Sequence, residues 1–307
     1  MKHLFFLIIV GILAVAAPVV AGEGDWNRFR GPQGDGICSE TGLLATWPAG
    51  GPKLLWKLEG LGMGYSSVTI VDGKLFTMGD RTAGGGKSQF VIAYDAATRK
   101  ELWSTRIGGA HKDGSRCTPT IDGERLYAIG TDGILLCCNV ADGNVLWSKS
   151  FPKDFGGKMM SGWRWSESPL VDGEKVLCTP GGPAATMVAL NKMTGAVIWK
   201  CRVPDLGSKG KPGAGYSSIV ISNGAGVKQY VQLFGRGVFG VEASTGTFLW
   251  GYNRVANGTA NIPTPVVCGD YIFASTQYNT GSALLKLSRD GKGVKAEEVW
   301  WLDKDQF

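Results

Sequence analysis

The sequence predicts an all-β fold, and three features of its composition favour this class. The chain has 307 residues, of which 47 are Gly and 11 are Trp, while charged residues make up 19%. Many glycines beside many aromatic residues are typical of short strands joined by tight turns. No long amphipathic helical pattern follows residue 22. With 44% apolar residues, the chain can bury a substantial core.

Two series of landmarks repeat in the same phase along the chain. Asp72, Asp122 and Asp172 each begin an Asp-Gly pair and lie 50 residues apart. The second series consists of tryptophans 44 to 52 residues apart, at Trp56, Trp103, Trp147, Trp199, Trp250 and Trp300. Periods of this length predict repeated supersecondary units such as propeller blades.

Each repeat is expected to form four short antiparallel strands. In the second unit these are residues 117–121, 124–130, 134–140 and 145–151, with Asp-Gly predicting a type I′ hairpin turn after the first. Such a sheet is apolar on both faces, so it must stack against similar sheets. The sequence therefore predicts a β-propeller in which the six tryptophans are structural and pack between neighbouring blades.

Five complete units are expected, at 65–107, 116–151, 166–203, 215–254 and 262–303. Residues 53–58, "KLLWKL", are interpreted as an orphan outer strand with no preceding strands of its own blade. We expect a signal peptide at 1–21, a leader segment at 22–52 and a C-terminally incomplete propeller at 53–307. Closure on five or six blades is the alternative.

The first 21 residues are typical of an export signal. The basic start "MKH" precedes a long apolar run, and Val19 and Ala21 fit cleavage after Ala21. An uncleaved anchor is the alternative, because the run approaches the length that spans a membrane. We expect a periplasmic or secreted protein with no transmembrane span after cleavage.

The repeats carry a family resemblance. "AYDAATRKELW" (93–103) resembles the A-x-D-x-x-T-G-x-x-x-W docking motif of PQQ-like, quinoprotein-type propellers of bacteria, and "ALNKMTGAVIW" (189–199) departs from it by Asn191. The leader "DWNRFRGPQGDG" (25–36) is similar to the start of exported members. The family includes pyrroloquinoline quinone (PQQ)-dependent alcohol dehydrogenases and a non-enzymatic scaffold lipoprotein of outer-membrane β-barrel assembly. The resemblance implies eight blades in the intact protein.

In a propeller, the loops between successive blades gather on one face around the central channel. Here these loops are long and distinctive, at residues 104–116, 151–167, 203–216 and 252–262. Loops held by a rigid scaffold are common binding sites. The candidate binding residues at this channel mouth are Tyr65, Ser66, Arg116, Trp165, Glu167, Tyr216, Ser217 and Asn261.

Two functions are consistent with these residues. The leading hypothesis is a non-catalytic binding or scaffold module for a protein, peptide or saccharide. The alternative, which the resemblance implies, is a PQQ- and Ca²⁺-dependent alcohol dehydrogenase, with Arg116, Trp165, Glu167 and Asn261 as the candidates nearest in type. No Asp suits the role of catalytic base, so we assign no catalytic residue and no metal ligand.

Several other classes of site are disfavoured by the sequence. The formal charge of +6 is spread along the chain without a basic block, which disfavours nucleic-acid binding. His111 is the only histidine beyond the signal segment, which excludes a multi-histidine metal site. We expect the seven cysteines to be free and buried. Cys137 and Cys138 are adjacent in a strand, where neighbouring side chains point to opposite faces.

Overall fold

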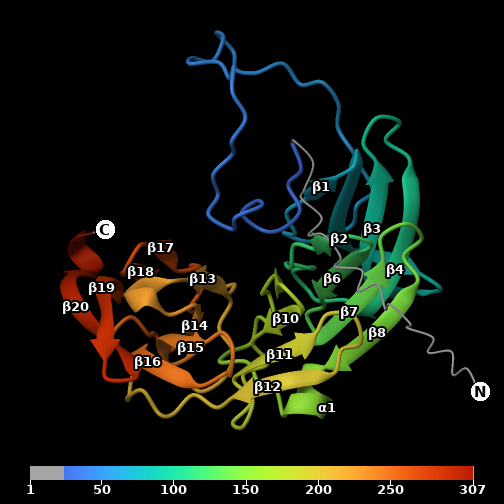
Figure 1. The fold of residues 1–307 in the computed structure, drawn as a ribbon. Coiled ribbons are helices and arrows are strands. Elements are labelled where there is room, and N and C mark those ends of the chain that lie inside the picture. The colour runs from blue at the N-terminus through green and yellow to red at the C-terminus, as the bar shows by residue number, and fades with distance from the viewer. Residues whose placement is uncertain (1–23, 307) are drawn as a thin grey trace, which may run out of the picture.

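The computed structural model describes residues 24–306, and the chain there forms five four-stranded antiparallel sheets. In every sheet the spatial order of the strands follows their order in the chain. The sheets follow one another along an open arc, from β1–β4 at one end to β17–β20 at the other (Figure 1). This arrangement confirms the prediction of an all-β chain built from propeller blades.

The strands divide evenly among the five blades. The first two blades contain β1 (Thr69–Val71), β2 (Lys74–Ala83), β3 (Gly86–Asp95), β4 (Glu101–Gly109), β5 (Thr120–Asp122), β6 (Arg125–Ile129), β7 (Ile134–Asn139) and β8 (Val145–Ser150). The third and fourth contain β9 (Leu170–Asp172), β10 (Lys175–Cys178), β11 (Met187–Asn191), β12 (Val197–Cys201), β13 (Val220–Ser222), β14 (Gln229–Phe234), β15 (Gly237–Glu242) and β16 (Phe248–Tyr252). The fifth contains β17 (Val266–Cys268), β18 (Tyr271–Thr276), β19 (Gly281–Asp290) and β20 (Gly293–Asp303).

Helical structure is confined to three short elements in the described residues. They are α1 (Phe151–Phe155), η1 (Gly224–Gly226) and η2 (Lys304–Gln306). None of the helices between residues 24 and 306 is long and apolar enough to cross a membrane. The predicted signal peptide at 1–21 lies outside the described residues.

The hairpin between the first two strands matches the predicted turn type in the first blade but differs from it in the second. Asp72 and Gly73 both have positive φ, at 49° and 69°, as a type I′ turn requires. In the second blade Asp122 instead pairs with Arg125, so the loop begins at Gly123, which alone has positive φ. That pattern matches a type II′ turn, in which glycine occupies the first loop position without a Cβ penalty. The type I′ prediction is therefore wrong for this hairpin.

Residues 53–58 do not form the predicted orphan strand. The segment has no regular secondary structure, and both Leu54 and Leu55 are exposed. A strand needs a partner for its backbone hydrogen bonds, and none of the described strands pairs with this segment. Trp56 is partly exposed and lies beneath the guanidinium of Arg99, 5.8 Å from the ring centroid.

Three of the landmark tryptophans pack against the next blade through a glycine. A Cβ built on Gly143 would lie 2.5 Å from the Trp103 ring, and one on Gly246 would lie 2.6 Å from the Trp199 ring. The Trp147 ring meets Gly195 in the same way. Each glycine belongs to the turn before the last strand of its blade, so the repeat brings a turn of one blade onto the indole of the preceding one.

The last two tryptophans are placed differently. The Trp250 indole donates to the Gln229 side chain of its own blade at 2.6 Å. Trp300 packs on Phe273 within the last sheet, and 37% of its surface is exposed. The fifth blade has a long β19–β20 hairpin, and nothing lies within 4 Å of a Cβ built on Gly291 in its turn, so this glycine does not pack on the Trp250 ring.

All seven cysteines are free, as expected, but they are not all buried. Cys38 and Cys268 are exposed, while the other five lie in the interior. Burial raises the pKa of the Cys137 thiol to about 11 and that of the Cys138 thiol to about 12. The adjacent pair is therefore structural and protonated at neutral pH.

Candidate functional site

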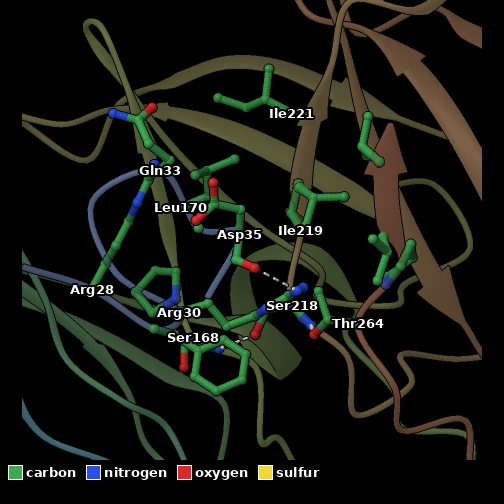
Figure 2. A pocket seen from close by; sticks show the side chains of 17 residues that line it. Arg28, Arg30, Gln33, Asp35, Ser168, Leu170, Ser218, Ile219, Ile221 and Thr264 are labelled. Carbon is green, nitrogen blue, oxygen red and sulfur yellow. Dashed lines mark hydrogen bonds between the residues drawn. The ribbon is translucent and has the colours of Figure 1, made fainter. Parts of the chain in front are cut away.

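A series of hydroxyl groups links the blades around the channel. The Ser168 Oγ accepts from the Thr118 backbone N–H at 2.9 Å, and the Ser218 Oγ accepts from the Ser168 N–H at 3.0 Å. The Thr264 Oγ1 in turn accepts from the Ser218 N–H at 3.2 Å (Figure 2). We call Ser168, Ser218 and Thr264 the hydroxyl ladder. It satisfies backbone donors just before the first strand of the second, third and fourth blades, where strand pairing has not yet begun.

The leader segment lies against the first strands of the first two blades. Trp26 exchanges two backbone hydrogen bonds with Ile70 in β1, and Asn27 pairs with Ile121 in β5. Arg28 and Arg30 then reach a cavity of about 200 Å³ between the leader and the hydroxyl ladder (Figure 2). The leader thus forms part of the channel wall.

A larger cavity of about 700 Å³ opens beside it on the loop-bearing face. All four long loops contribute to its lining, together with Phe29 and Arg30 of the leader and with the hydroxyl ladder. Of the eight candidate residues, the structure places three in this lining: Tyr65, Arg116 and Tyr216. We take this cavity as the candidate binding site, and call it the channel-mouth cavity.

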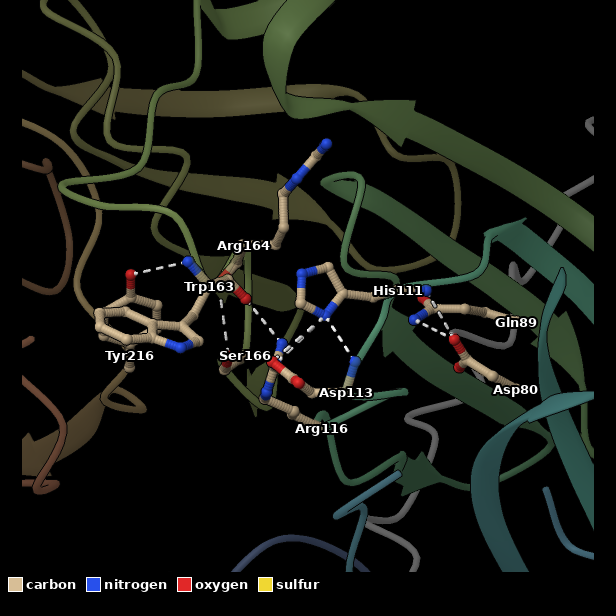
Figure 3. A network of polar contacts seen from close by, with 9 residues as sticks. All are labelled: Asp80, Gln89, His111, Asp113, Arg116, Trp163, Arg164, Ser166 and Tyr216. Carbon is tan, nitrogen blue, oxygen red and sulfur yellow. Dashed lines mark hydrogen bonds and ion pairs between the residues drawn. The ribbon is translucent and has the colours of Figure 1, made fainter. Parts of the chain in front are cut away.

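Arg116 is held in place by its neighbours. Its guanidinium donates to the Trp163 carbonyl at 2.6 Å and to the Asp113 carboxylate at 3.0 Å, and it lies 3.2 Å from Nδ1 of His111 (Figure 3). Burial and the nearby Arg116 charge lower the pKa of His111, so the imidazole is neutral at pH 7. Arg116 therefore positions the Trp163 loop, and its charge is paired with Asp113.

The aromatic wall of the cavity comes from two loops. The rings of Trp163 and Tyr216 meet edge to face, with centroids 6.1 Å apart. The Tyr216 hydroxyl accepts from the Trp163 N–H at 3.3 Å (Figure 3). It also lies 2.5 Å from Oγ of Ser161. Trp165 rather than Trp163 was predicted at the channel mouth, because no strand periodicity in this loop indicates which tryptophan faces the cavity.

Trp165 and Glu167 are buried and do not line the channel-mouth cavity. Trp165 packs edge to face on Phe151, with ring centroids 5.9 Å apart. Glu167 is 2% exposed, and its carboxylate accepts from the Thr179 N–H, the Thr179 hydroxyl and the Gln232 amide. Burial raises the pKa of Glu167 to about 8. Both residues therefore support the interior between blades.

The other three candidates also make structural contacts. The Ser66 Oγ donates to the Cys117 carbonyl at 2.7 Å, which links the first two blades. The Ser217 Oγ donates to the Gln232 side chain at 2.8 Å. Asn261 is fully buried, and its amide donates to the Phe234 carbonyl at 2.8 Å. These residues shape the walls behind the cavity without lining it.

The lining of the channel-mouth cavity differs from what PQQ and Ca²⁺ require. A protein calcium site needs several oxygen ligands, usually including carboxylates. None of the described residues that line the channel-mouth cavity is an Asp or a Glu. In the described chain no three His, Cys, Asp or Glu side chains lie close enough together to hold a metal. These residues do not fit a calcium-bound quinone.

Comparisons with solved structures show where the fold recurs. The chain resembles the quinohemoprotein alcohol dehydrogenase of Comamonas testosteroni, with a TM-score of 0.51 at 16% identity over 77% of this chain and 43% of that one. For the quinohemoprotein alcohol dehydrogenase ADHIIG of Pseudomonas putida HK5 the TM-score is 0.50 at 16% identity, over 81% of this chain and 43% of that one. For BamB from Moraxella catarrhalis the TM-score is 0.38 at 19% identity, over 79% of this chain and 73% of that one. The chain spans less than half of either dehydrogenase, and identities this low show the fold alone.

Sequence comparison identifies the family. None of the curated proteins compared matches the chain. The family model described as outer membrane protein assembly factor BamB matches residues 87–301, from the start of β3 through most of β20. Because this match covers more than two thirds of the chain and its blades are those of the PQQ-like propellers, the protein belongs to the BamB family of PQQ-like repeat proteins.

Proposed function

We propose that the protein is an exported, non-catalytic binding or scaffold module that binds its partner at the loop-bearing face. The observation that carries this proposal is the lining of the channel-mouth cavity, which combines aromatic rings, hydroxyls and arginine without a carboxylate. Tyr, Trp and Arg are the residues that contribute most to protein interfaces. A general base for alcohol oxidation would have to be a lining group that accepts a proton, and this lining offers none of the usual ones.

The alternative is a PQQ- and Ca²⁺-dependent alcohol dehydrogenase, which the likeness to the two dehydrogenases suggests. Glu167 is the buried carboxylate closest to the required type, but Thr179 and Gln232 already occupy its oxygens. A calcium ion would have to displace those hydrogen bonds. The dehydrogenase hypothesis therefore lacks a free carboxylate at the site.

Calorimetric titration of PQQ with Ca²⁺, followed by a dye-linked alcohol oxidation assay, separates the two functions. We expect no calcium-dependent binding and no turnover. Tight, calcium-dependent binding with turnover would overturn the scaffold proposal. A Glu167→Gln variant would then show whether Glu167 holds the ion, because the amide removes the negative charge with little change in shape.

We also propose that the protein acts in the periplasm or outside the cell, after cleavage following Ala21. The support is the pattern of a basic start, an apolar run and small residues at Val19 and Ala21. N-terminal sequencing of the protein from an exporting host should begin at Gly22. A chain that keeps Met1 and stays in the membrane fraction would show an uncleaved anchor instead.

A further inference from the structure

We infer that the channel-mouth cavity binds an acidic peptide segment, in which a carboxylate lies next to an aromatic or aliphatic side chain. This inference rests on the proposed function and names the chemistry of the partner. Three features of the cavity support it: the hydrogen-bond donors of the lining, the charge of Arg30 and the exposed rings at the mouth.

The lining is rich in hydrogen-bond donors. Its polar side chains are arginine, tryptophan, tyrosine, serine and threonine, and none of the described lining residues is Asp, Glu, Asn or Gln. Guanidinium and indole groups only donate, whereas a carboxylate only accepts. A carboxylate is therefore the ligand group that this set of side chains satisfies best.

The hydroxyl ladder adds two hydroxyl protons to the donors of the lining. The oxygens of Ser218 and Thr264 each accept a backbone N–H from the preceding blade. In the part of the chain that the structure describes, neither hydroxyl donates its own proton to a protein atom. Since both residues line the cavity, these two protons are available to an acceptor inside it.

Arg30 supplies a charge that no described carboxylate pairs. Its Nη2 donates to the Asp35 carbonyl at 3.1 Å, but none of the ion pairs among residues 24–306 includes it. Arg116, by contrast, is paired with Asp113. Hydrogen bonds between an arginine and a carboxylate are among the strong ones in proteins. Arg30 is therefore the group that would bind the acidic residue.

Exposed apolar surface surrounds this charge. The side chain of Tyr65 is 77% exposed, and those of Trp163, Ile262 and Tyr278 are also exposed. All four line the cavity. Exposed apolar side chains that gather in one cavity are typical of binding surfaces. They would contact an aromatic or aliphatic side chain beside the bound carboxylate.

A peptide suits this lining better than a neutral saccharide. Sugar hydroxyls donate as well as accept, so their sites usually include carboxylate or amide oxygens as acceptors, whereas the described lining offers only hydroxyls as side-chain acceptors. A peptide offers carbonyl acceptors along its backbone, and its acidic side chains complement a chain of formal charge +6. A cavity of about 700 Å³ accommodates a few residues.

The test selects peptides from a random 12-residue displayed library on the purified protein. The selected peptides are synthesised, and their affinities are measured for the protein and for Arg30→Gln, Tyr65→Ala and Arg202→Gln. We expect enrichment of peptides that combine Asp or Glu with Phe, Tyr, Trp or Leu. Arg30→Gln should weaken their binding about tenfold, as expected for a lost charged hydrogen bond. Tyr65→Ala should weaken it severalfold without changing the Tm, because that side chain is exposed.

Arg202→Gln is the matched control, since it removes the same charge from an exposed residue outside the cavity. The selected peptides should bind the Arg202→Gln variant with an affinity within about twofold of that for the unmodified protein. The inference is overturned if the library yields no acidic peptide, if Arg30→Gln and Arg202→Gln behave alike, or if oligogalacturonate binds in place of any peptide. The proposed function fails separately, through PQQ-dependent turnover.

Discussion

The indole of Trp147 lies against Gly195 of the next blade, so closely that a Cβ on this glycine would come within 2.8 Å of the ring. The indole N–H of Trp147 also donates to the carbonyl of Lys192 in the same turn at 3.1 Å. The contact therefore fixes both the distance and the orientation of one blade on another. It explains why the sequence repeats a turn together with a tryptophan: the indoles of Trp103, Trp147 and Trp199 each pack on the turn of the following blade.

Replacing Gly195 with Ala should destabilise the protein by about 2–4 kcal/mol. The new methyl group would clash with the Trp147 ring, and alanine would also be strained at the positive φ of 71°. Gly173→Ala is the matched control, because Gly173 has a φ of 56° but open space around it. It should cost only about 1–2 kcal/mol. Urea unfolding measures both values, and equal losses would show that packing against Trp147 contributes nothing.

The repeat made the blades predictable from the sequence. Asp72, Asp122 and Asp172 mark the first hairpins of the first three blades, and glycine turns precede the last strands of the second to fourth, so local signals agree with the fold in the first four units. The failure at residues 53–58 has a physical cause: the segment carries the apolar pattern and the tryptophan of a last strand, but a strand forms only where a partner supplies hydrogen bonds.

The candidate site was less predictable. Tyr65, Arg116 and Tyr216 were placed at the channel mouth by their position in the repeat, and they line the cavity. Trp163 and Trp165 are two residues apart in an irregular loop, where neither periodicity nor composition indicates which ring faces the cavity and which is buried. The contribution of Arg30 depends on how the leader folds back onto β1 and β5, and no local pattern in the sequence specifies that return.

Truncation of the two loop tryptophans should destabilise the protein by different amounts. Trp165→Ala should cost about 3–5 kcal/mol of stability, because the ring is buried against Phe151 and Gly133. Trp163→Ala should cost less than about 1.5 kcal/mol, since that ring is partly exposed and mainly contacts Tyr216. Chemical denaturation of both variants checks this. A larger loss for Trp163 would mean that the channel-mouth loop, rather than the ring behind it, stabilises the blade.

The hydroxyl ladder should contribute to stability through the backbone donors that it satisfies. Ser218→Ala leaves the buried Ser168 N–H without its acceptor and should cost about 1–3 kcal/mol. Ser166→Ala provides a matched control, because that exposed hydroxyl only makes a 3.4 Å contact with the Arg164 carbonyl. Its stability should change by less than about 0.5 kcal/mol. Equal effects would mean that water replaces Ser218 at no cost.

Glu167 should make the protein less stable as the pH rises. Burial raises the pKa of its carboxyl from 4.5 to about 8, against the opposing effect of the hydrogen bonds from Thr179. Between these pH values the folded protein keeps the proton and the unfolded chain releases it, so raising the pH favours unfolding. The stabilisation is complete below pH 4.5 and is lost by about pH 8.

Each unit of pKa shift corresponds to about 1.4 kcal/mol, so the loss from pH 5 to pH 8.5 should be on the order of several kcal/mol. Urea unfolding at both pH values measures the loss, and Glu167→Gln should remove most of it, because the amide does not titrate. Other groups also titrate in this range, His111 among them, but they contribute equally to both proteins. An unchanged pH dependence in Glu167→Gln would show that the hydrogen bonds from Thr179 and Gln232 keep this carboxylate charged in the folded protein, in spite of its burial.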